Sequence, residues 1–231
     1  MKTKTRSLCC TKSNKTTIRK MNKWVKNLEP LIKKYGKRKI PLDYNNRYQL
    51  LVMVLLAAQT TDKLINKVTG AFFEKYPSMA ELKKSTAEDL HPFLKSITGF
   101  RKKSNWLVEL AQTVGEDNKI PVTLKGLTNL RGIGRKTANV IIRESGDKAE
   151  GVVVDLHVVR VAPRLGVVNT AKPDKIESQL MEVMPQEKWN EIGMTLSFHG
   201  RETCRPKPKC EECIVSSVCN YYATSVKTSQ K

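Results

Sequence analysis

Four cysteines lie close together near the C-terminal end of the sequence and are suited to bind a metal. They follow the pattern C-x5-C-x2-C-x5-C and are Cys204, Cys210, Cys213 and Cys219. Soft thiolate ligands at this density are typical of a zinc site or an iron–sulfur cluster. Disulfides are the alternative, which we disfavour because nothing marks the chain as secreted. The spacing does not distinguish zinc from iron. Either metal site would cross-link a segment that is too short to form its own hydrophobic core.

A second stretch, LRGIGRKTANVII at residues 130–142, predicts a tight hairpin that leads into a helix. The helix begins with Arg135 and Lys136, although the positive end of the helix dipole disfavours cations. Because Gly132 and Gly134 have no side chains, the backbone can approach a ligand closely and its N–H groups can converge on an anion. A DNA phosphate would supply the negative charge that offsets the repulsion.

Two other phosphate-binding motifs do not fit this stretch. A P-loop requires G-x-x-x-x-G-K-[ST] after a strand, whereas here Arg135 stands between Gly134 and Lys136. A dinucleotide-binding fingerprint requires a third glycine where Lys or Thr stands. The remaining interpretation is helix, G-x-G hairpin, helix.

The segment GVVVDLHVVRV, residues 151–161, has two interpretations. Its valines favour a strand. Alternatively, the carboxylate of Asp155 accepts the first backbone N–H groups of a helix that runs through His157 and Arg160. The sequence leaves both open. We expect a structural or phosphate-binding role for His157 rather than a catalytic one.

Composition points to a polyanionic partner. Lys and Arg outnumber Asp and Glu by 42 to 22, which gives a formal net charge of +20, so nucleic acid is the first partner to consider. An anionic membrane surface fits less well. The longest apolar run, LLVMVLLAA at residues 50–58, is far shorter than the roughly 20 residues of a spanning helix and predicts a buried helix instead.

The N-terminal residues 1–23 are basic, contain no acid and have few large apolar side chains. Such a stretch buries little surface, so we predict a disordered arm, which acts as a solvated tail, an accessory DNA-binding arm or a transit peptide. Cys9 and Cys10 lie inside it and are expected to be bystanders. From residue 24 onward the pattern is helical, with clear segments at residues 48–58, 62–76, 103–114, 124–130, 137–143 and 175–184.

Four motifs in order resemble the endonuclease III family of DNA glycosylases with lyase activity. They are LLAAQTTD at residues 55–62, LRGIGRKTANVII, VVVDLHVVRV and the HGRETC segment with its following cysteines. The resemblance runs from about Trp24 to Cys219. It implies an all-α helix-hairpin-helix glycosylase fold in which a six-helix domain and an iron–sulfur domain flank a DNA-binding cleft.

The resemblance also implies domain boundaries and partners. We expect a basic arm at 1–23, a helix at 24–37 that packs with the cluster domain, a six-helix domain at 38–148, a [4Fe-4S] domain at 149–222 and a flexible tail at 223–231. The partner would be double-stranded DNA with damaged bases or abasic sites, bound by a monomer with no membrane contact. The protein would act in the bacterial nucleoid or in a nucleus.

The resemblance assigns the chemistry to Lys136 and Asp155. A damaged base is attacked at C1′ of its deoxyribose after the nucleotide is extruded from the stack. A Lys amine can displace the base and remain as a Schiff base, from which β-elimination cuts the strand. Only the unprotonated amine attacks, and we expect burial, Arg135 and the positive helix end to favour it. Asp155 would support the developing sugar cation and assist proton transfer, a role that a plain N-cap would not have.

Further residues are expected to contact DNA. Gln59 would enter the gap left by the flipped nucleotide; the alternative is a helix C-cap. Phe100 would be an apolar wedge on a loop beside the cations Arg101, Lys102 and Lys103; the alternative is a core Phe. The other predicted DNA contacts are Arg131, Gly132, Gly134, Arg135, Arg205, Lys207 and Lys209. The cluster itself would brace DNA-contacting residues and take no part in the chemistry.

The sequence departs from the family pattern at three points. The family usually has Pro at Arg131, Thr at Leu156 and one more residue between the first two cysteines. Leu156 removes a hydroxyl beside Asp155, which we expect to alter substrate preference. Two alternatives remain: a monofunctional mismatch glycosylase, which normally lacks a Lys at 136, and a DNA-binding module with a structural zinc, which leaves Lys136 and Asp155 unexplained.

Overall fold

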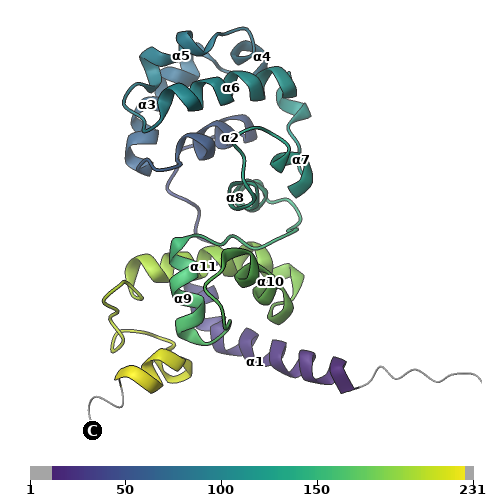
Figure 1. Ribbon diagram of the computed structural model, residues 1–231, viewed down its shortest axis with the longest axis vertical. Helices are drawn as coiled ribbons and strands as arrows, with labels where there is room; N and C mark the ends of the chain where they lie inside the picture. The colour runs from purple at the N-terminus through teal and green to yellow at the C-terminus, as the bar shows by residue number, and fades with distance from the viewer. Residues whose placement is uncertain (1–11, 227–231) are drawn as a thin grey trace, which may run out of the picture. The chain divides into compact units, whose positions relative to one another are not determined.

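The computed structural model describes residues 12–226, and all regular secondary structure in that range is helical (Figure 1). The all-α prediction is therefore confirmed. The chain divides into two compact units. One comprises the segment that ends at Lys37 together with the segment from Val154 onward, and the other runs from Arg38 to Val153. In the described residues, no helix is both long enough and apolar enough to cross a membrane.

The unit from Arg38 to Val153 is built around a central apolar helix. Helix α2 (Arg47–Leu56) is buried along its length from Leu50 to Leu56, which confirms the buried helix predicted from the apolar run. Helices α3, α6 and α8 pack against α2, and α5 covers both α3 and α6. The elements after α2 are α3 (Asp62–Lys75), α4 (Met79–Leu82), α5 (Ala87–Leu94), α6 (Phe100–Val114), the 3₁₀ turn η1 (Asp117–Lys119), α7 (Leu124–Thr128) and α8 (Arg135–Ser145).

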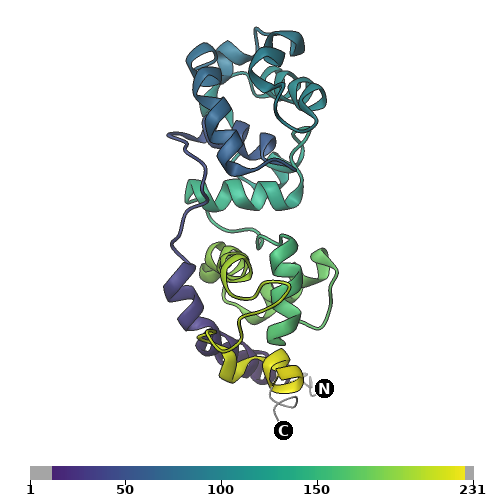
Figure 2. The ribbon, with the colours of Figure 1, turned by 90° about the vertical axis from the view of Figure 1, so that its left-hand side faces the viewer.

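The other unit has helix α11 (Trp189–Glu202) at its centre. Residues 192–200 of α11 are buried, between α9 (Leu156–Leu165) and α1 (Lys12–Tyr35), and α10 (Pro173–Val183) packs on α1 (Figures 1 and 2). Gly200 permits the close approach of α9: a Cβ there would lie 2.9 Å from both the His157 Cβ and a Val161 methyl. The remaining elements are η2 (Gln186–Lys188), η3 (Ser216–Val218) and the short π-helix η4 (Tyr222–Val226).

Helix α1 begins at Lys12, so the prediction of a disordered arm over residues 1–23 was wrong for its second half. The sequence contains the reason. Met21, Val25 and Leu28 recur at intervals of four and three residues, which is the spacing of one helix face. That face continues through Leu31, and the helix packs on α11 and α10, so tertiary contacts stabilise a basic helix that composition alone disfavours. Cys9 and Cys10 lie outside the described residues.

The Val-rich segment is helical from Leu156 to Leu165, and its residues before Leu156 form no strand. Val152 and Val153 are buried, and the Asn139 side chain donates to the Val152 carbonyl over 3.2 Å. The helical interpretation with Asp155 as N-cap is thus confirmed. The burial of Val158 and Val161 outweighs the strand propensity of valine, which is a weak preference compared with packing.

Candidate functional site

The G-x-G stretch forms the predicted hairpin between α7 and α8. The Ile133 N–H donates to the Leu130 carbonyl over 3.1 Å, and Gly132 closes the turn with φ +84°. A side chain at Gly132 would be both strained and obstructed, because a Cβ there would lie 2.8 Å from the Trp106 ring. Gly132 is therefore required by the turn and by the packing of α6.

Gly134 is the N-cap of α8 and has a different role. Its φ of −84° is available to any residue, and a Cβ there would meet no atom within 4 Å. No side chain caps the helix at this residue. The first backbone N–H groups of a helix lack intrahelical acceptors, so an open, uncapped helix start is suited to bind an anion.

Arg135 and Lys136 are the first two residues of α8, and both are exposed. The expectation that burial would help to deprotonate Lys136 is thus wrong for the free protein. The reason is its place in the first turn of the helix: the residues that α8 buries begin only at Ala138.

Asp155 caps α9 and is held at both carboxylate oxygens. Its Oδ1 accepts from the N–H groups of His157 and Val158, each over 2.9 Å, and its Oδ2 accepts from the Ser197 hydroxyl over 2.6 Å. The guanidinium of Arg201 lies 3.8 Å from Oδ2. Sequence reasoning did not identify Ser197 and Arg201, because α11 brings them to Asp155 from far along the chain.

Leu156 and His157 follow Asp155 on α9. Leu156 is 70% exposed, the most exposed large apolar side chain in the described part of the chain. Burial lowers the pKa of His157 from its ordinary value; Asp155 opposes the shift, and Arg201 and Arg160 add to it. Arg160 also contacts the His157 ring at Nδ1 and donates to the Gly200 and Cys204 carbonyls. A structural role for His157 agrees with these contacts.

Gln59 lies two residues beyond Ala57, the C-cap of α2, so the alternative of a simple C-cap is excluded. It is exposed, and its φ of +58° is the only positive value at a non-glycine residue in the described range. Left-handed backbone costs a side-chain-bearing residue about 1 kcal/mol and persists only when the surroundings impose it.

Phe100 begins α6 instead of lying on a loop, directly after Gly99 with its φ of +69°. The ring is half-buried and stands edge-on to His91 with centroids 5.1 Å apart, so it is not a core residue. Lys103, which the sequence groups with the cations beside Phe100, does not lie on the surface. Lys103 is only 5% exposed and points its amine at the segment after α2.

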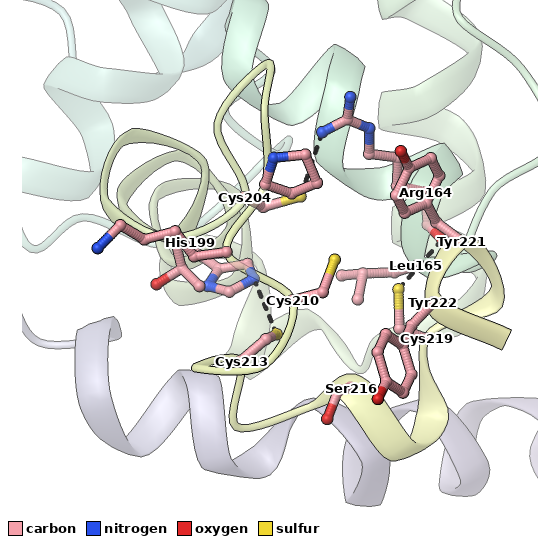
Figure 3. A pocket seen from close by; sticks show the side chains of 13 residues that line it. Arg164, Leu165, His199, Cys204, Cys210, Cys213, Ser216, Cys219, Tyr221 and Tyr222 are labelled. Carbon is pink, nitrogen blue, oxygen red and sulfur yellow. Dashed lines mark hydrogen bonds between the residues drawn. The ribbon is translucent and has the colours of Figure 1, made fainter. Parts of the chain in front are cut away.

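The four cysteines line one pocket, although they come from separate turns of the chain after α11 (Figure 3). All four are free thiols, which excludes the disulfide alternative. Burial raises the pKa of Cys210 and of Cys213, and the neighbouring cysteines raise it further. Four thiolates in one pocket therefore need a cationic group to hold them.

Two side chains that the sequence did not single out support the cysteine pocket. Arg164 on α9 donates to the carbonyls of Arg205 and Pro206 over 2.7 and 3.1 Å, and its NH1 lies 3.7 Å from the Cys204 sulfur. The buried His199 ring places Nε2 3.6 Å from the Cys213 sulfur (Figure 3). The pocket also includes Leu165 and two tyrosines, so its lining is partly apolar.

The donor set fits a site for a soft metal group. Four cysteine thiols line the pocket, and four thiolates are the ligands both of a structural zinc ion and of an iron–sulfur cluster. Within the part of the chain that the structure describes, no three His, Cys, Asp or Glu side chains are grouped to hold one metal ion.

The loop between the first two cysteines is exposed at its three cations. Arg205 donates to the Arg201 carbonyl over 3.1 Å. Lys209 is paired with Glu212 over 3.1 Å, so part of its charge is already neutralised. Lys207 is exposed. Arg131, in the hairpin, likewise lies 3.5 Å from Glu109 in an exposed ion pair.

Comparison with known proteins defines the class. Residues 52–186 match the model of the HhH-GPD superfamily of base excision DNA repair proteins. The fold agrees: a solved structure of a trapped covalent endonuclease III–DNA intermediate has a TM-score of 0.77 and 30% identity, over 91% of this chain and 99% of that chain. A thermostable thymine-DNA glycosylase, at 24% identity and a TM-score of 0.71, shares the fold.

Curated relatives narrow the class further. Endonuclease III of Synechocystis is 36% identical over 77% of this chain and 83% of its own length, and that of Bacillus subtilis is 35% identical over the same shares. The chain belongs to the endonuclease III family, the bifunctional DNA glycosylases and AP lyases of base excision repair. The resemblance expected from the four motifs is thereby confirmed.

Proposed function

We propose that this enzyme removes oxidised pyrimidines from double-stranded DNA and cuts the strand at the resulting abasic site, with Lys136 as the nucleophile. The observation that carries the proposal is the placement of Lys136 on the exposed first turn of α8, directly after an uncapped G-x-G hairpin. An anion held at that helix start brings a DNA backbone to the amine. The trapped endonuclease III–DNA intermediate shows that a relative forms a covalent bond to DNA.

The proposed reaction begins with the unprotonated amine. It forms a bond to C1′ while the bond from C1′ to the base breaks, and the base leaves with the electron pair and takes up a proton. The C1′–O4′ bond then breaks, the ring oxygen takes up a proton, and a protonated imine remains between Lys136 and C1′. Loss of a C2′ proton then expels the 3′ phosphate, and water finally hydrolyses the imine and releases the enzyme.

Asp155 supplies a fixed carboxylate for this reaction. Capping by Oδ1 and the bond from Ser197 to Oδ2 hold it without rotational freedom, and the Arg201 guanidinium lies 3.8 Å from Oδ2. A preorganised negative group stabilises the developing positive charge on the sugar. Leu156, exposed beside it, offers an apolar contact where the family usually has a hydroxyl, and we infer that it affects which lesion is preferred.

Both units contribute DNA contacts in this proposal. The hairpin residues Arg131, Gly132, Gly134 and Arg135 bind phosphate, and so does the loop with Arg205, Lys207 and Lys209. Phe100, half-buried at the start of α6, serves as the wedge, and the exposed Gln59 fills the gap left by the flipped nucleotide.

Cys204, Cys210, Cys213 and Cys219 would hold a [4Fe-4S] cluster. Bound there, the cluster would act as a structural cross-link and would supply no step of the reaction. Its effect on DNA is indirect: Arg164 joins α9 to the carbonyls of the loop between Cys204 and Cys210, and that loop carries the three cations.

A borohydride trap tests the nucleophile. Reduction of the imine during reaction with abasic duplex DNA should leave a covalent protein–DNA adduct. The adduct should be absent in Lys136→Gln and present, at saturating DNA, in the neighbouring Arg135→Gln. A monofunctional glycosylase would give no adduct in the wild-type protein, and an adduct retained in Lys136→Gln would assign the attack to another amine.

A further inference from the structure

Lys103 is a buried cation whose donors are directed at one short loop. Its Nζ donates to the Leu56 carbonyl over 2.8 Å and the Ala58 carbonyl over 2.5 Å, and lies 3.4 Å from the Thr60 hydroxyl. All three acceptors are neutral, although burial of an ammonium ion is costly unless its hydrogen bonds are satisfied. Burial lowers the pKa of Lys103 from its ordinary value. A cation buried at such a position indicates that the surrounding acceptors need its three N–H donors.

The acceptors lie where α2 ends. The last carbonyls of a helix lack intrahelical donors and carry the negative end of the helix dipole, so a Lys amine is well suited to bind them. Leu56 is the last residue of α2, and Ala58 follows one residue after the C-cap. A single side chain from α6 thus completes the termination of α2.

Two of the acceptors flank the strained residue directly. Ala58 precedes Gln59 and Thr60 follows it, and the Thr60 N–H donates back to the Ala57 carbonyl over 3.1 Å. Gln59 has φ +58° between them and is exposed. The ammonium therefore holds the residues before and after Gln59, which fixes the backbone of Gln59 in a conformation that it would otherwise leave.

We propose that Lys103 is a positioning residue: it holds the 57–60 loop in the left-handed conformation that presents Gln59 to the DNA. The inference rests on the role proposed above for Gln59. Without the amine the loop would sample more conformations, and ordering it on DNA would cost binding free energy. The amine does not touch the substrate.

A double-mutant cycle tests this role. Lys103→Met keeps the length of the side chain but removes its charge and its donors. With abasic duplex DNA as substrate, it should lower kcat/KM of strand cleavage about tenfold, since hydrogen bonds to charged groups contribute about that factor. In a Gln59→Ala background the same change should alter kcat/KM less than about twofold, because residues that act through one another are not additive. Lys83 is an exposed lysine of the same unit, so Lys83→Met is the matched control. It should leave kcat/KM unchanged both in the wild-type background and in the Gln59→Ala background.

A second measurement reports the loop without DNA. Hydrogen exchange of the Thr60 amide should become faster in Lys103→Met, whereas amides in the middle of α6 should keep their protection. The proposal would be overturned if Lys103→Met lowered kcat/KM equally in the wild-type and Gln59→Ala backgrounds. Unchanged hydrogen exchange of the Thr60 amide would overturn it as well. If Lys103→Met does not fold, the same two measurements are made on Lys103→Arg. The bulkier guanidinium keeps the positive charge but not the geometry of the hydrogen bonds.

If the wild-type protein formed no borohydride adduct and cut no abasic DNA, the proposed function would fall, while faster exchange at Thr60 in Lys103→Met would still show that Lys103 holds the loop. If the enzyme is active and Gln59→Ala has wild-type kcat/KM, the role of Gln59 falls, and the positioning role of Lys103 falls with it.

Discussion

The Ser197 hydroxyl donates to the Asp155 carboxylate over 2.6 Å, across the contact between α11 and α9. The same carboxylate caps α9 with its other oxygen. Capping therefore occupies Oδ1, and the role in the reaction that we propose for Asp155 falls to Oδ2. Substitutions at these two residues can separate the two roles.

Asp155→Asn should lower kcat by roughly 10²-fold or more and leave the melting temperature nearly unchanged. Asn caps a helix as well as Asp does, whereas loss of a positioned acid or base typically reduces the rate by about that factor. Asp155→Ala should lose the rate and in addition about 1 kcal/mol of stability. Single-turnover cleavage and thermal unfolding measure the two effects. If Asp155→Asn were slow and also lost as much stability as Asp155→Ala, Asp155 would act only as a cap.

Gly132→Ala should lower the free energy of unfolding by about 1–3 kcal/mol, because the residue adopts φ +84° and its new methyl group would meet the Trp106 ring. Gly134→Ala is the matched control. Its backbone is not strained and its surroundings are open, so stability should change by less than about 1 kcal/mol. Urea unfolding gives both values, and equal losses would contradict the packing argument.

Gly134→Ala should nevertheless weaken binding of duplex DNA, because the added methyl group occupies the open space at the start of α8. A well-folded Gly134→Ala protein with wild-type affinity, measured by fluorescence anisotropy, would show that the phosphate does not approach the hairpin here.

Stability should fall as the pH is lowered below about 6.5, partly because of His157, whose folded-state pKa lies below its unfolded value. Between those two pKa values the unfolded state binds a proton that the folded state does not, so the folded state loses stability as the pH falls. Above about 6.5 both states are neutral and the contribution is absent. The groups that face the ring are Asp155, Arg160 and Arg201.

The test is the melting temperature of His157→Gln at pH about 7.5 and about 5.5. The difference between the two temperatures should be smaller than in the wild-type protein. A variant with the full wild-type difference would show that other groups cause the whole pH dependence.

The purified protein should contain about four iron atoms and absorb visible light, as expected of a [4Fe-4S] cluster with four thiolate ligands. Cys210→Ser should lose iron and melt at a lower temperature, since binding of a structural metal group contributes directly to folding. Iron analysis and calorimetry measure these effects. One zinc per chain instead of iron would contradict the cluster and favour the zinc-stapled alternative.

The sequence by itself determined the features that depend on neighbouring residues. The hairpin follows from two glycines before a helical pattern, the buried α2 from a continuous apolar run, and the common pocket of the cysteines from their close spacing. The motifs in order were sufficient to predict the family. Each of these signals is local, because turn chemistry, apolar periodicity and ligand spacing act over a few residues.

The tertiary structure decided what depends on contacts between distant segments. Packing on α11 and α10 stabilises α1, so that the helix extends into the basic N-terminal stretch. Packing of α9 overrides the strand preference of valine. Lys103 looked like a surface cation, yet the approach of α6 to the end of α2 buries its amine. Ser197 reaches Asp155 from 42 residues away. No local pattern encodes such pairs, because the free energy that fixes them comes from burial and hydrogen bonds formed only after the helices pack.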